Sequence, residues 1–281
     1  MRIAIQGELG SFSHEAAIRR DGEASITSCA VSAEVFEALL AGRVDAAVVP
    51  IENSLAGPVA EHYDLLLASA VTIESESMLR IRHNLVAAPG YGSDESRIAR
   101  LRRVYSHPVA LAQCRRFFLQ HPHLQAVPAY DTAGSVKRLM ESSLPAPEEA
   151  AIASRQAAAE YGGQILAGAI EDNPQNYTRF FLIRRSAEAR VSPGADKVSV
   201  AFSVQNRPGS LVEVLMIFAE AGTNLTKIES RPVQGQPWQY IFYVDYQLSA
   251  SALADVVMER LGAHCSMVKD LGRYRTAEPP A

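Results

Sequence analysis

The chain has 281 residues, of which 48% are apolar and 21% are charged, and its formal net charge at pH 7 is -4. This composition is ordinary for a globular protein, and the length suffices for two domains. The arginines are scattered and the net charge is negative, which argues against a nucleic-acid-binding protein. No run approaches the ~18 consecutive apolar residues of a transmembrane helix, so we expect no membrane association.

The cysteines and the N-terminus indicate where the protein works. Cys29, Cys114 and Cys265 are odd in number and far apart, which fits reduced thiols better than a disulfide framework or a zinc site. The chain starts with a short strand that runs into Gly7, without the pattern of a signal peptide. We therefore expect a cytoplasmic protein. No metal-ligand spacing, Walker loop or dinucleotide fingerprint occurs, so we predict neither a metal nor another cofactor.

Residues 1–185 alternate short apolar runs with amphipathic helical patterns, which is typical of an α/β domain. Ser32 and Thr132 are candidate helix caps, and Pro108 suits the first turn of a helix. Strands are predicted at 2–6, 45–50, 78–88, 104–106, 150–153, 165–170 and 178–184, and helices at 32–40, 57–69, 93–102, 108–119, 132–141 and 154–161.

A polar segment at 186–196, which contains Pro193-Gly194, has the composition of a linker. The strand and helix patterns after it follow the order βαββαβ over residues 197–275, which predicts a ferredoxin-like unit. Residues 276–281 are expected to form a tail. The strands of this unit are predicted at 197–204, 223–231, 238–247 and 265–271, and the helices at 208–221 and 250–261.

Two polar clusters follow predicted strands near the N-terminus, where α/β folds usually bind ligands. The first, from Gly7 to Ser13, contains glycines that permit a tight turn before a helix start that can hold an anion. It could equally be a plain strand-to-helix connection. The second consists of Glu52, Asn53 and Ser54, which either point into a cleft or cap the next helix.

Two further clusters lie later in the chain. Ser106 and His107 end a short strand, with Gln113 in the following helix, and His107 could equally be a structural histidine. Asp131 and Thr132 precede another helix. Arg179 opens an otherwise apolar strand, where it could bind a carboxylate bidentately or lie at the surface.

Six motifs, in order and at consistent separations, give these clusters a common interpretation. They are "VVPIENSLAG" (48–57), "SHPVALAQC" (106–114), "DTAGSV" (131–136), "NYTRFFLI" (176–183), "NRPGSLVEVL" (206–215) and "IESRP" (228–232).

The first four motifs resemble the catalytic domain of prephenate dehydratases, and the last two resemble phenylalanine-binding ACT domains. The resemblance implies an α/β catalytic domain of two lobes, like a periplasmic binding protein, with the active site between them. Lobe one comprises about 1–77 and 176–185, and lobe two about 78–170. A ferredoxin-like ACT regulatory domain follows.

The resemblance also implies the reaction and its residues: decarboxylative dehydration of prephenate to phenylpyruvate. We expect Thr178 to hydrogen-bond the departing hydroxyl and to relay a proton from water or Glu52, and we expect Arg179 to anchor a substrate carboxylate. The implied catalytic residues are Thr178, Arg179, Glu52, Asn53 and Ser54, and the implied substrate-binding residues are Ser11, Phe12, Ser106, His107, Gln113, Asp131, Thr132 and Phe180.

For the ACT domain, the resemblance implies feedback regulation by phenylalanine bound at an interface between two copies. A homodimer or homotetramer through the ACT domains is therefore expected. The implied effector-binding residues are Asn206, Arg207, Pro208, Gly209, Ser210, Leu211, Val212, Asn224, Glu229, Ser230, Arg231 and Pro232.

Two alternatives remain open from the sequence. The first glycine loop reads Glu8-Leu9 where the family usually has a proline, and "YDLLL" at 63–67 with "SLAG" resembles plant arogenate dehydratases. An arogenate dehydratase would form phenylalanine directly. The second alternative is a non-catalytic amino-acid sensor, which we would expect to have lost the Thr-Arg-Phe or Glu-Asn-Ser residues.

Overall fold

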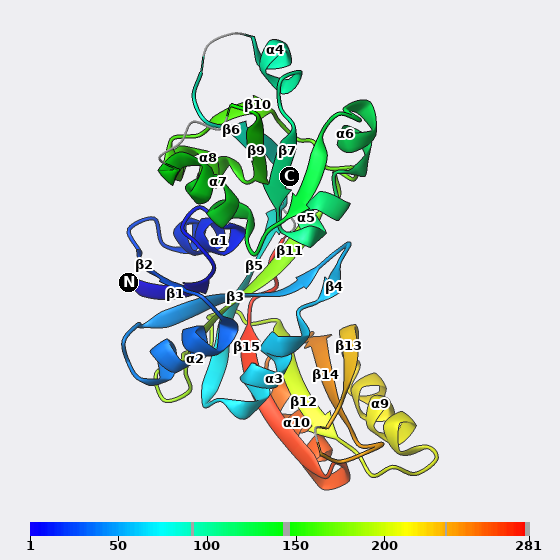
Figure 1. The fold of residues 1–281 in the computed structure, drawn as a ribbon. Helices are drawn as coiled ribbons and strands as arrows, with labels where there is room; N and C mark the ends of the chain where they lie inside the picture. Colours follow the sequence, from blue (N-terminus) through cyan, green and yellow to red (C-terminus); the bar gives the residue numbers. More distant parts are fainter. Residues whose placement is uncertain (91–92, 143–146, 234, 279–281) are drawn as a thin grey trace. The chain divides into compact units, whose positions relative to one another are not determined.

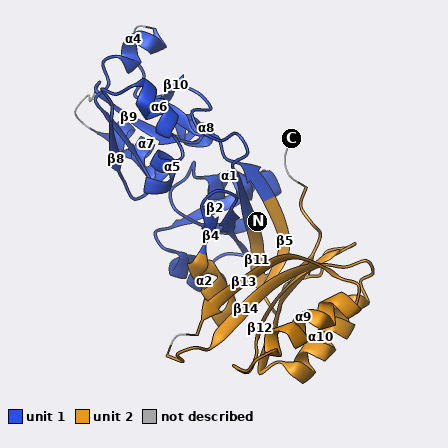
Figure 2. Cartoon of the chain, turned by 90° about the vertical axis from the view of Figure 1, so that its right-hand side faces the viewer, with its two compact units in different colours: residues 1–59, 78–180, 279–281 blue, residues 60–77, 181–278 orange. Residues whose placement is uncertain are grey.

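The computed structural model describes residues 1–90, 93–142, 147–233 and 235–278 (Figure 1). These residues divide into two compact units (Figure 2). Unit 1 comprises residues 1–59 and 78–180, and unit 2 comprises residues 60–77 and 181–278. No helix in the described part of the chain is long and apolar enough to cross a membrane.

The first sheet has the order β2-β1-β3-β11-β5, with the short strand β4 paired to β3. β1 runs parallel to both β2 and β3. Strand β5 begins in unit 2 and ends in unit 1, whereas β11 begins in unit 1 and ends in unit 2. The elements of this part are β1 (Arg2–Gln6), α1 (Phe12–Arg20), β2 (Ser25–Cys29), α2 (Ser32–Leu40), β3 (Ala46–Asn53), β4 (Gly57–Pro58), β5 (Val71–Arg80) and β11 (Tyr177–Arg185).

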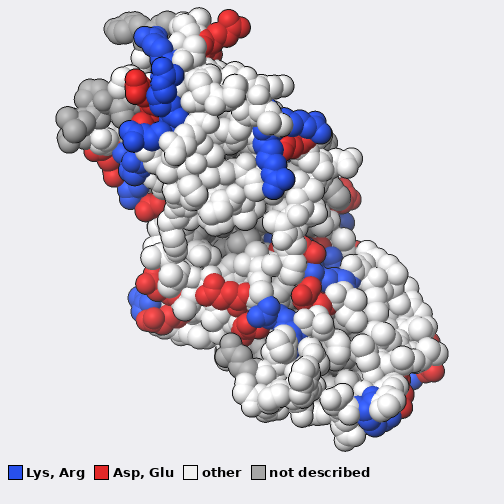
Figure 3. All heavy atoms as spheres, turned by 45° about the vertical axis from the view of Figure 1, so that its right-hand side comes forward, with Lys and Arg blue, Asp and Glu red and all other residues white. Residues whose placement is uncertain are grey.

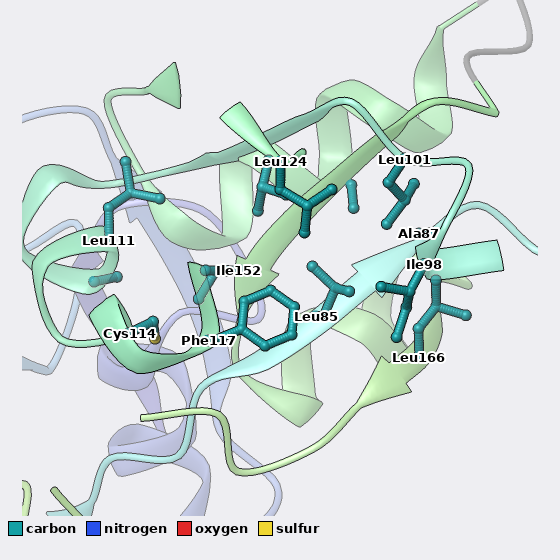
Figure 4. Close-up of a cluster of buried hydrophobic side chains, with 13 residues drawn as sticks. Leu85, Ala87, Ile98, Leu101, Leu111, Cys114, Phe117, Leu124, Ile152 and Leu166 are labelled. Carbon is teal, nitrogen blue, oxygen red and sulfur yellow. The ribbon is translucent and has the colours of Figure 1, made fainter. Parts of the chain in front are cut away.

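The second sheet, in unit 1, has the order β10-β6-β9-β7-β8 and mixes parallel and antiparallel pairs. Side chains of β6 alternate between its two faces. Leu85 joins a core with Phe117 and Leu124 (Figure 4), while Val86 packs with Val136 on the other face. The elements are β6 (Asn84–Ala87), α4 (Asp94–Ile98), β7 (Arg103–Ser106), α5 (Pro108–Ala112), α6 (Arg115–Gln120), β8 (Gln125–Pro128), α7 (Thr132–Glu141), β9 (Glu149–Ala153), α8 (Arg155–Tyr161) and β10 (Gln164–Ala167).

Unit 2 contains an antiparallel sheet of order β13-β14-β12-β15, covered by α9 and α10 (Figure 1). Phe202 of the sheet and Phe218 of α9 are both 1% exposed or less, so they form part of its core. Its elements are β12 (Lys197–Ser203), α9 (Ser210–Glu220), β13 (Asn224–Pro232), β14 (Tyr240–Gln247), α10 (Leu253–His264) and β15 (Met267–Tyr274).

Helix α3 (Ala60–Ala68) belongs to unit 2 because polar contacts hold it to this sheet. Lys269 of β15 donates to the carbonyls of Leu66, Leu67 and Ser69 at 2.6–2.8 Å, where the helix ends. A lysine at a helix C-terminus satisfies carbonyls that have no partner within the helix. Three separate donors from one ammonium therefore fix this helix end on the sheet.

The α/β fold class and the βαββαβ order are confirmed. Several local predictions were wrong. The strand predicted at 78–88 is divided between β5 and β6, and the helix predicted at 108–119 is divided between α5 and α6. Asp131, not Thr132, caps α7 through a hydrogen bond from Gly134 N–H.

The predicted limits of the lobes, the linker and the regulatory domain stay predictions. The two compact units have different limits: α3 and the first part of β5, which the prediction assigned to lobe one, group with the unit 2 sheet. Residues 279–281 of the predicted tail lie outside the described residues.

Candidate functional site

Unit 1 contains a cavity of about 530 Å³. Polar residues at strand ends and helix starts meet hydrophobic side chains on its wall, as in typical small-molecule sites. The structure places these sequence-predicted residues along it: Ser11, Phe12, Asn53, His107, Gln113, Asp131, Thr132, Thr178 and Phe180.

The glycine loop before α1 packs tightly against the start of α7. Gly7 has a φ of +92°, and a Cβ there would lie 2.7 Å from a carboxylate oxygen of Asp131. The same oxygen accepts a hydrogen bond from Glu8 N–H at 2.9 Å. Only glycine fits at position 7, because its backbone conformation and this close approach both exclude a side chain. The pattern Gly7-x-x-Gly10 thus shapes the cavity wall.

Asn53 sits at the centre of the polar part of the wall. Its Oδ1 accepts hydrogen bonds from Leu55 N–H at 3.0 Å and Ala56 N–H at 2.9 Å. Its Nδ2 lies 2.9 Å from Thr178 Oγ1 and 2.8 Å from Asn176 Oδ1. The two backbone donors fix which end of the amide is oxygen, so the nitrogen must face Thr178.

Gln113 extends this network on the far side of Asn176. Its Oε1 accepts from Asn176 Nδ2 at 2.8 Å and lies 2.9 Å from His83 Nε2. Burial lowers the pKa of His83. The hydrogen bond to Gln113 and the charge of Glu171 act in the opposite direction, but burial has the larger effect. A buried, neutral histidine therefore borders the cavity beside the amide network.

Four of the predicted cleft residues do not line the cavity. Ser106 is fully buried and donates to the Ile152 carbonyl at 2.6 Å, which ties β7 to β9. Ser54 donates to the Gln175 carbonyl and accepts from Tyr177 N–H at 3.0 Å. These two serines therefore support the surrounding backbone. The remaining two residues are Glu52 and Arg179.

Arg179 lies between two cavity-lining residues of β11, Thr178 and Phe180. Successive side chains of a strand point to opposite faces of the sheet, so the alternation directs Arg179 away from this wall. Arg179 is 8% exposed. Its predicted contact with substrate stays a prediction.

Unit 2 has a smaller cavity of about 230 Å³ near the start of α9. Asn206, Arg207 and the residues from Gly209 to Val212 line it, together with Trp238, Tyr240 and Phe242. The second effector motif lies elsewhere: Asn224 and Glu229–Pro232 belong to β13 and do not line this cavity. One chain thus does not bring the two predicted effector motifs into one cavity.

Sequence reasoning missed several residues of the site. Gln6, His83 and Tyr130 line the unit 1 cavity, and Asn176 bridges Asn53 and Gln113. His83 lies inside the segment 78–88 that was predicted as one strand, and no local feature of the sequence marked it as a site residue. No group of His, Cys, Asp and Glu that could hold a metal ion occurs among the described residues.

Charged side chains offer no second site on the surface that Figure 3 shows. Basic and acidic side chains are intermixed on that face, over the described part of the chain. Extended patches of one sign are the usual footprint of nucleic-acid binding. The charge distribution on this face gives no support to such a partner.

Comparison with known families gives two matches. Residues 3–188 match the family model described as prephenate dehydratase, and residues 198–245 match the model described as ACT domain. A bifunctional chorismate mutase/prephenate dehydratase of Stutzerimonas stutzeri is 37% identical over 99% of this chain and 74% of its own length. An Arabidopsis thaliana protein named arogenate dehydratase/prephenate dehydratase 2, chloroplastic, is also 37% identical, over 98% of this chain and 72% of its own length.

Solved structures show the same fold over the whole chain. Prephenate dehydratase of Arthrobacter aurescens, in complex with L-Phe, matches with a TM-score of 0.87 and 34% identity over 100% of this chain and 92% of that chain. A chain described as GqqA, a novel type of quorum quenching acylase, also has a TM-score of 0.87, with 32% identity over 99% of both chains.

Proposed function

This chain belongs to the prephenate dehydratase family, and we propose that it converts prephenate to phenylpyruvate in the unit 1 cavity. The observation that carries this proposal is the orientation of Thr178. Asn53 Nδ2 carries two hydrogens and faces three acceptors: Asn176 Oδ1 at 2.8 Å, Thr178 Oγ1 at 2.9 Å and the Tyr177 carbonyl at 3.1 Å. Because Nδ2 can only donate, Thr178 Oγ1 is the acceptor in its hydrogen bond with Asn53. The hydroxyl hydrogen of Thr178 then remains available for a substrate in the cavity that this residue lines.

The reaction needs help mainly at the departing hydroxyl group. The bond from the ring to the carboxylate breaks and carbon dioxide leaves. Its electron pair completes the aromatic ring, the ring carbon–oxygen bond breaks, and the hydroxide takes up a proton to form water. Thr178 is too weak an acid to give that proton outright, so it polarises the breaking bond through a hydrogen bond. Water supplies the proton, because Glu52 does not line the cavity.

The surviving carboxylate of the pyruvyl side chain needs an anchor. Ser11, Phe12 and Ser13, at the start of α1, line the cavity. The first N–H groups of a helix have no partner within the helix and attract anions. The N-terminus of α1 is therefore our proposed anchor, in place of Arg179, which does not line the cavity. Arg179→Lys should raise KM only if Arg179 contributes, and an unchanged KM and kcat would exclude it from the anchor.

Prephenate is favoured over arogenate because the described cavity wall offers little to bind an ammonium group. Arogenate carries an ammonium group, which needs an acceptor such as a carboxylate. Among the described residues that line the cavity, the carboxylate is Asp131. Its oxygens already accept from Glu8 N–H at 2.9 Å and Gly134 N–H at 3.1 Å. Among the described lining residues, the ammonium of arogenate thus finds no carboxylate without backbone partners, and the preference for prephenate rests on this missing acceptor.

An acylase activity like that of the GqqA relative is less well supported. Acyl transfer by a hydroxyl or thiol needs a base beside the nucleophile. The cavity histidines have other partners: His83 contacts Gln113, and His107 accepts from Val109 N–H. Burial raises the pKa of Cys114, which disfavours its thiolate. A sensor without catalysis is disfavoured because Thr178 and Asn53 are both in place.

Regulation by phenylalanine is proposed for unit 2. The family match, the L-Phe complex of the Arthrobacter relative and the cavity beside the Gly209 turn support it. A second copy would supply the Glu229–Pro232 motif that one chain leaves outside this cavity. We therefore propose a homodimer or homotetramer through unit 2, and a cytoplasmic location for the enzyme.

The test is an assay of the purified protein with prephenate, arogenate and an acylated quorum-sensing molecule, each with and without phenylalanine. We expect phenylpyruvate from prephenate, with inhibition by phenylalanine. Preferred turnover of arogenate would replace the substrate but keep the chemistry, and acyl cleavage without dehydration would overturn the proposal. Sedimentation with and without phenylalanine tests the assembly, since a monomer under both conditions would contradict it.

A further inference from the structure

A chain of side-chain hydrogen bonds runs from Thr178 in the cavity wall back to a buried histidine. Asn53 Nδ2 lies 2.9 Å from Thr178 Oγ1 and 2.8 Å from Asn176 Oδ1. Gln113 Oε1 lies 2.8 Å from Asn176 Nδ2 and 2.9 Å from His83 Nε2. Distant parts of the sequence thus meet in one polar network, and His83 stands at its end.

The direction of each hydrogen bond follows from two backbone groups. Leu55 and Ala56 N–H donate to Asn53 Oδ1, so the nitrogen of this amide faces Asn176. Asn176 then presents its oxygen to Asn53 and its nitrogen to Gln113. Gln113 Nε2 lies 3.4 Å from Asn53 Oδ1, which agrees with the same orientation. Its Oε1 accepts, and the ring nitrogen that faces this oxygen must carry a hydrogen.

His83 is therefore protonated on Nε2, and its Nδ1 has no hydrogen-bond partner among the described residues. The residue is 2% exposed, and Phe12 of the cavity wall contacts its ring edge to face, with centroids 5.8 Å apart. A buried acceptor without a partner is unfavourable for folding. Packing alone would favour an apolar side chain at this position. What a histidine adds is the Nε2–H that donates to Gln113.

We propose that His83 is a positioning residue for the dehydration step. Its Nε2–H holds Gln113 Oε1, Gln113 holds Asn176, and Asn176 Oδ1 supports the Asn53 amide in the orientation that Leu55 and Ala56 N–H fix. Asn53 in turn keeps Thr178 Oγ1 as an acceptor, so the hydroxyl hydrogen points to the substrate. The inference rests on the proposed function. It adds to the site a residue that acts on the substrate only through Gln113, Asn176 and Asn53.

Two substitutions separate the donor from the packing of the ring. His83→Gln keeps a side-chain N–H at similar reach, whereas His83→Leu fills similar space without any donor. His123→Leu is the control, because His123 lies outside this network: its Nε2 is 3.1 Å from the Ile98 carbonyl and its ring contacts that of His121. The readouts are kcat and KM for prephenate, and the midpoint of thermal unfolding.

We expect His83→Leu to lower kcat about 10-fold, with KM within about 2-fold and an unchanged or higher thermal midpoint. His83→Gln should recover kcat to within about 3-fold of the wild type, and the control should match the wild type. Wild-type kcat in His83→Leu would overturn the proposal. Equal loss of kcat in both variants, with lowered thermal midpoints, would assign His83 a packing role and would also overturn it.

A second measurement does not depend on activity. Nitrogen NMR of histidine-labelled protein, with His83→Gln to assign the signal, should show a neutral ring protonated on Nε2 at pH 7. A ring protonated on Nδ1, or a charged ring, would overturn the hydrogen-bond chain. If the wild type failed to turn over prephenate while this signal was present, the proposed function would fail and the orientation chain would stand.

Discussion

Arg231 of β13 holds Asp64 of α3 with two parallel hydrogen bonds, from Nε at 2.9 Å and from Nη2 at 2.7 Å. Arg231 lies in the predicted effector motif, and Asp64 lies on the helix that follows the cavity-lining residues 57–59 directly in the chain. Bidentate pairs of this kind fix both position and orientation. The pair therefore links β13, which carries the predicted effector motif, to α3, the helix that follows the cavity-lining residues 57–59.

Asp64→Asn should weaken feedback inhibition while leaving catalysis intact. The substitution removes the charge that Arg231 binds but changes no predicted effector residue. We expect the phenylalanine concentration for half inhibition to rise about 5-fold or more, because coupling between sites is typically worth 1–3 kcal/mol. Inhibition curves measure this. Glu37→Gln, which removes a surface pair with Arg43 at 3.2 Å, is the control. Unchanged inhibition in Asp64→Asn would refute the link.

Thr178→Ala should lower kcat by about 100-fold or more, because the hydrogen bond to the departing hydroxyl is lost. Thr178→Ser retains the hydroxyl and should lose less than about 10-fold. Steady-state assays with prephenate distinguish these outcomes, with circular dichroism to confirm folding. Similar kcat values for the wild type and both variants would exclude Thr178 from the chemistry.

Asn53→Asp tests the direction of the hydrogen bond to Thr178. A carboxylate cannot donate, so Thr178 would turn its hydroxyl hydrogen toward residue 53 and away from the substrate. We expect kcat to fall at least as far as in Thr178→Ala, with the fold retained. Activity near that of the wild type would show that Asn53 does not set this orientation.

Lys197 and Glu76 form a buried ion pair in unit 2, 3.1 Å apart, with side chains 7% and 0% exposed. Lys197→Met leaves the buried carboxylate without this cation and should destabilise the protein by about 3–5 kcal/mol. The double variant Lys197→Met/Glu76→Leu should recover most of that loss, since apolar groups replace both charges. Urea unfolding measures both. A double variant as unstable as the single one would contradict this account.

Stability at acid pH should depend on Arg2 and Asp45. Hydrogen bonds from the side chain and backbone of Arg2 lower the pKa of Asp45 to about 2. A lowered pKa in the folded state means that this stabilisation is full above the ordinary value near 4 and is lost as the pH falls toward 2. The stability difference between the wild type and Arg2→Gln should therefore shrink across this window. Urea unfolding between pH 2.5 and 7 tests it, and a difference independent of pH would contradict it.

The sequence by itself determined the fold class and the βαββαβ order of unit 2. Hydrophobic periodicity is a local property, so it is readable without neighbours. The two predicted helix caps were each one residue too late, since Val31 and Asp131 occupy the cap positions of α2 and α7. The Thr178 and Asn53 motifs were likewise identifiable, and both lie where a site was expected. The division of the predicted strand at 78–88 could not be identified from the sequence, because no glycine or proline separates β5 from β6.

Only the tertiary structure decided which of these side chains work together. Thr178 and Phe180 line the cavity while Arg179 does not, because the pairing of β11 between β3 and β5 determines which face of the strand meets the cavity. Ser106 donates to the Ile152 carbonyl instead of facing a ligand. His83 joins Gln113 across 30 positions of sequence. Such contacts depend on the order and register of the strands. Interactions throughout the domain determine both, so these contacts leave no pattern in the local sequence.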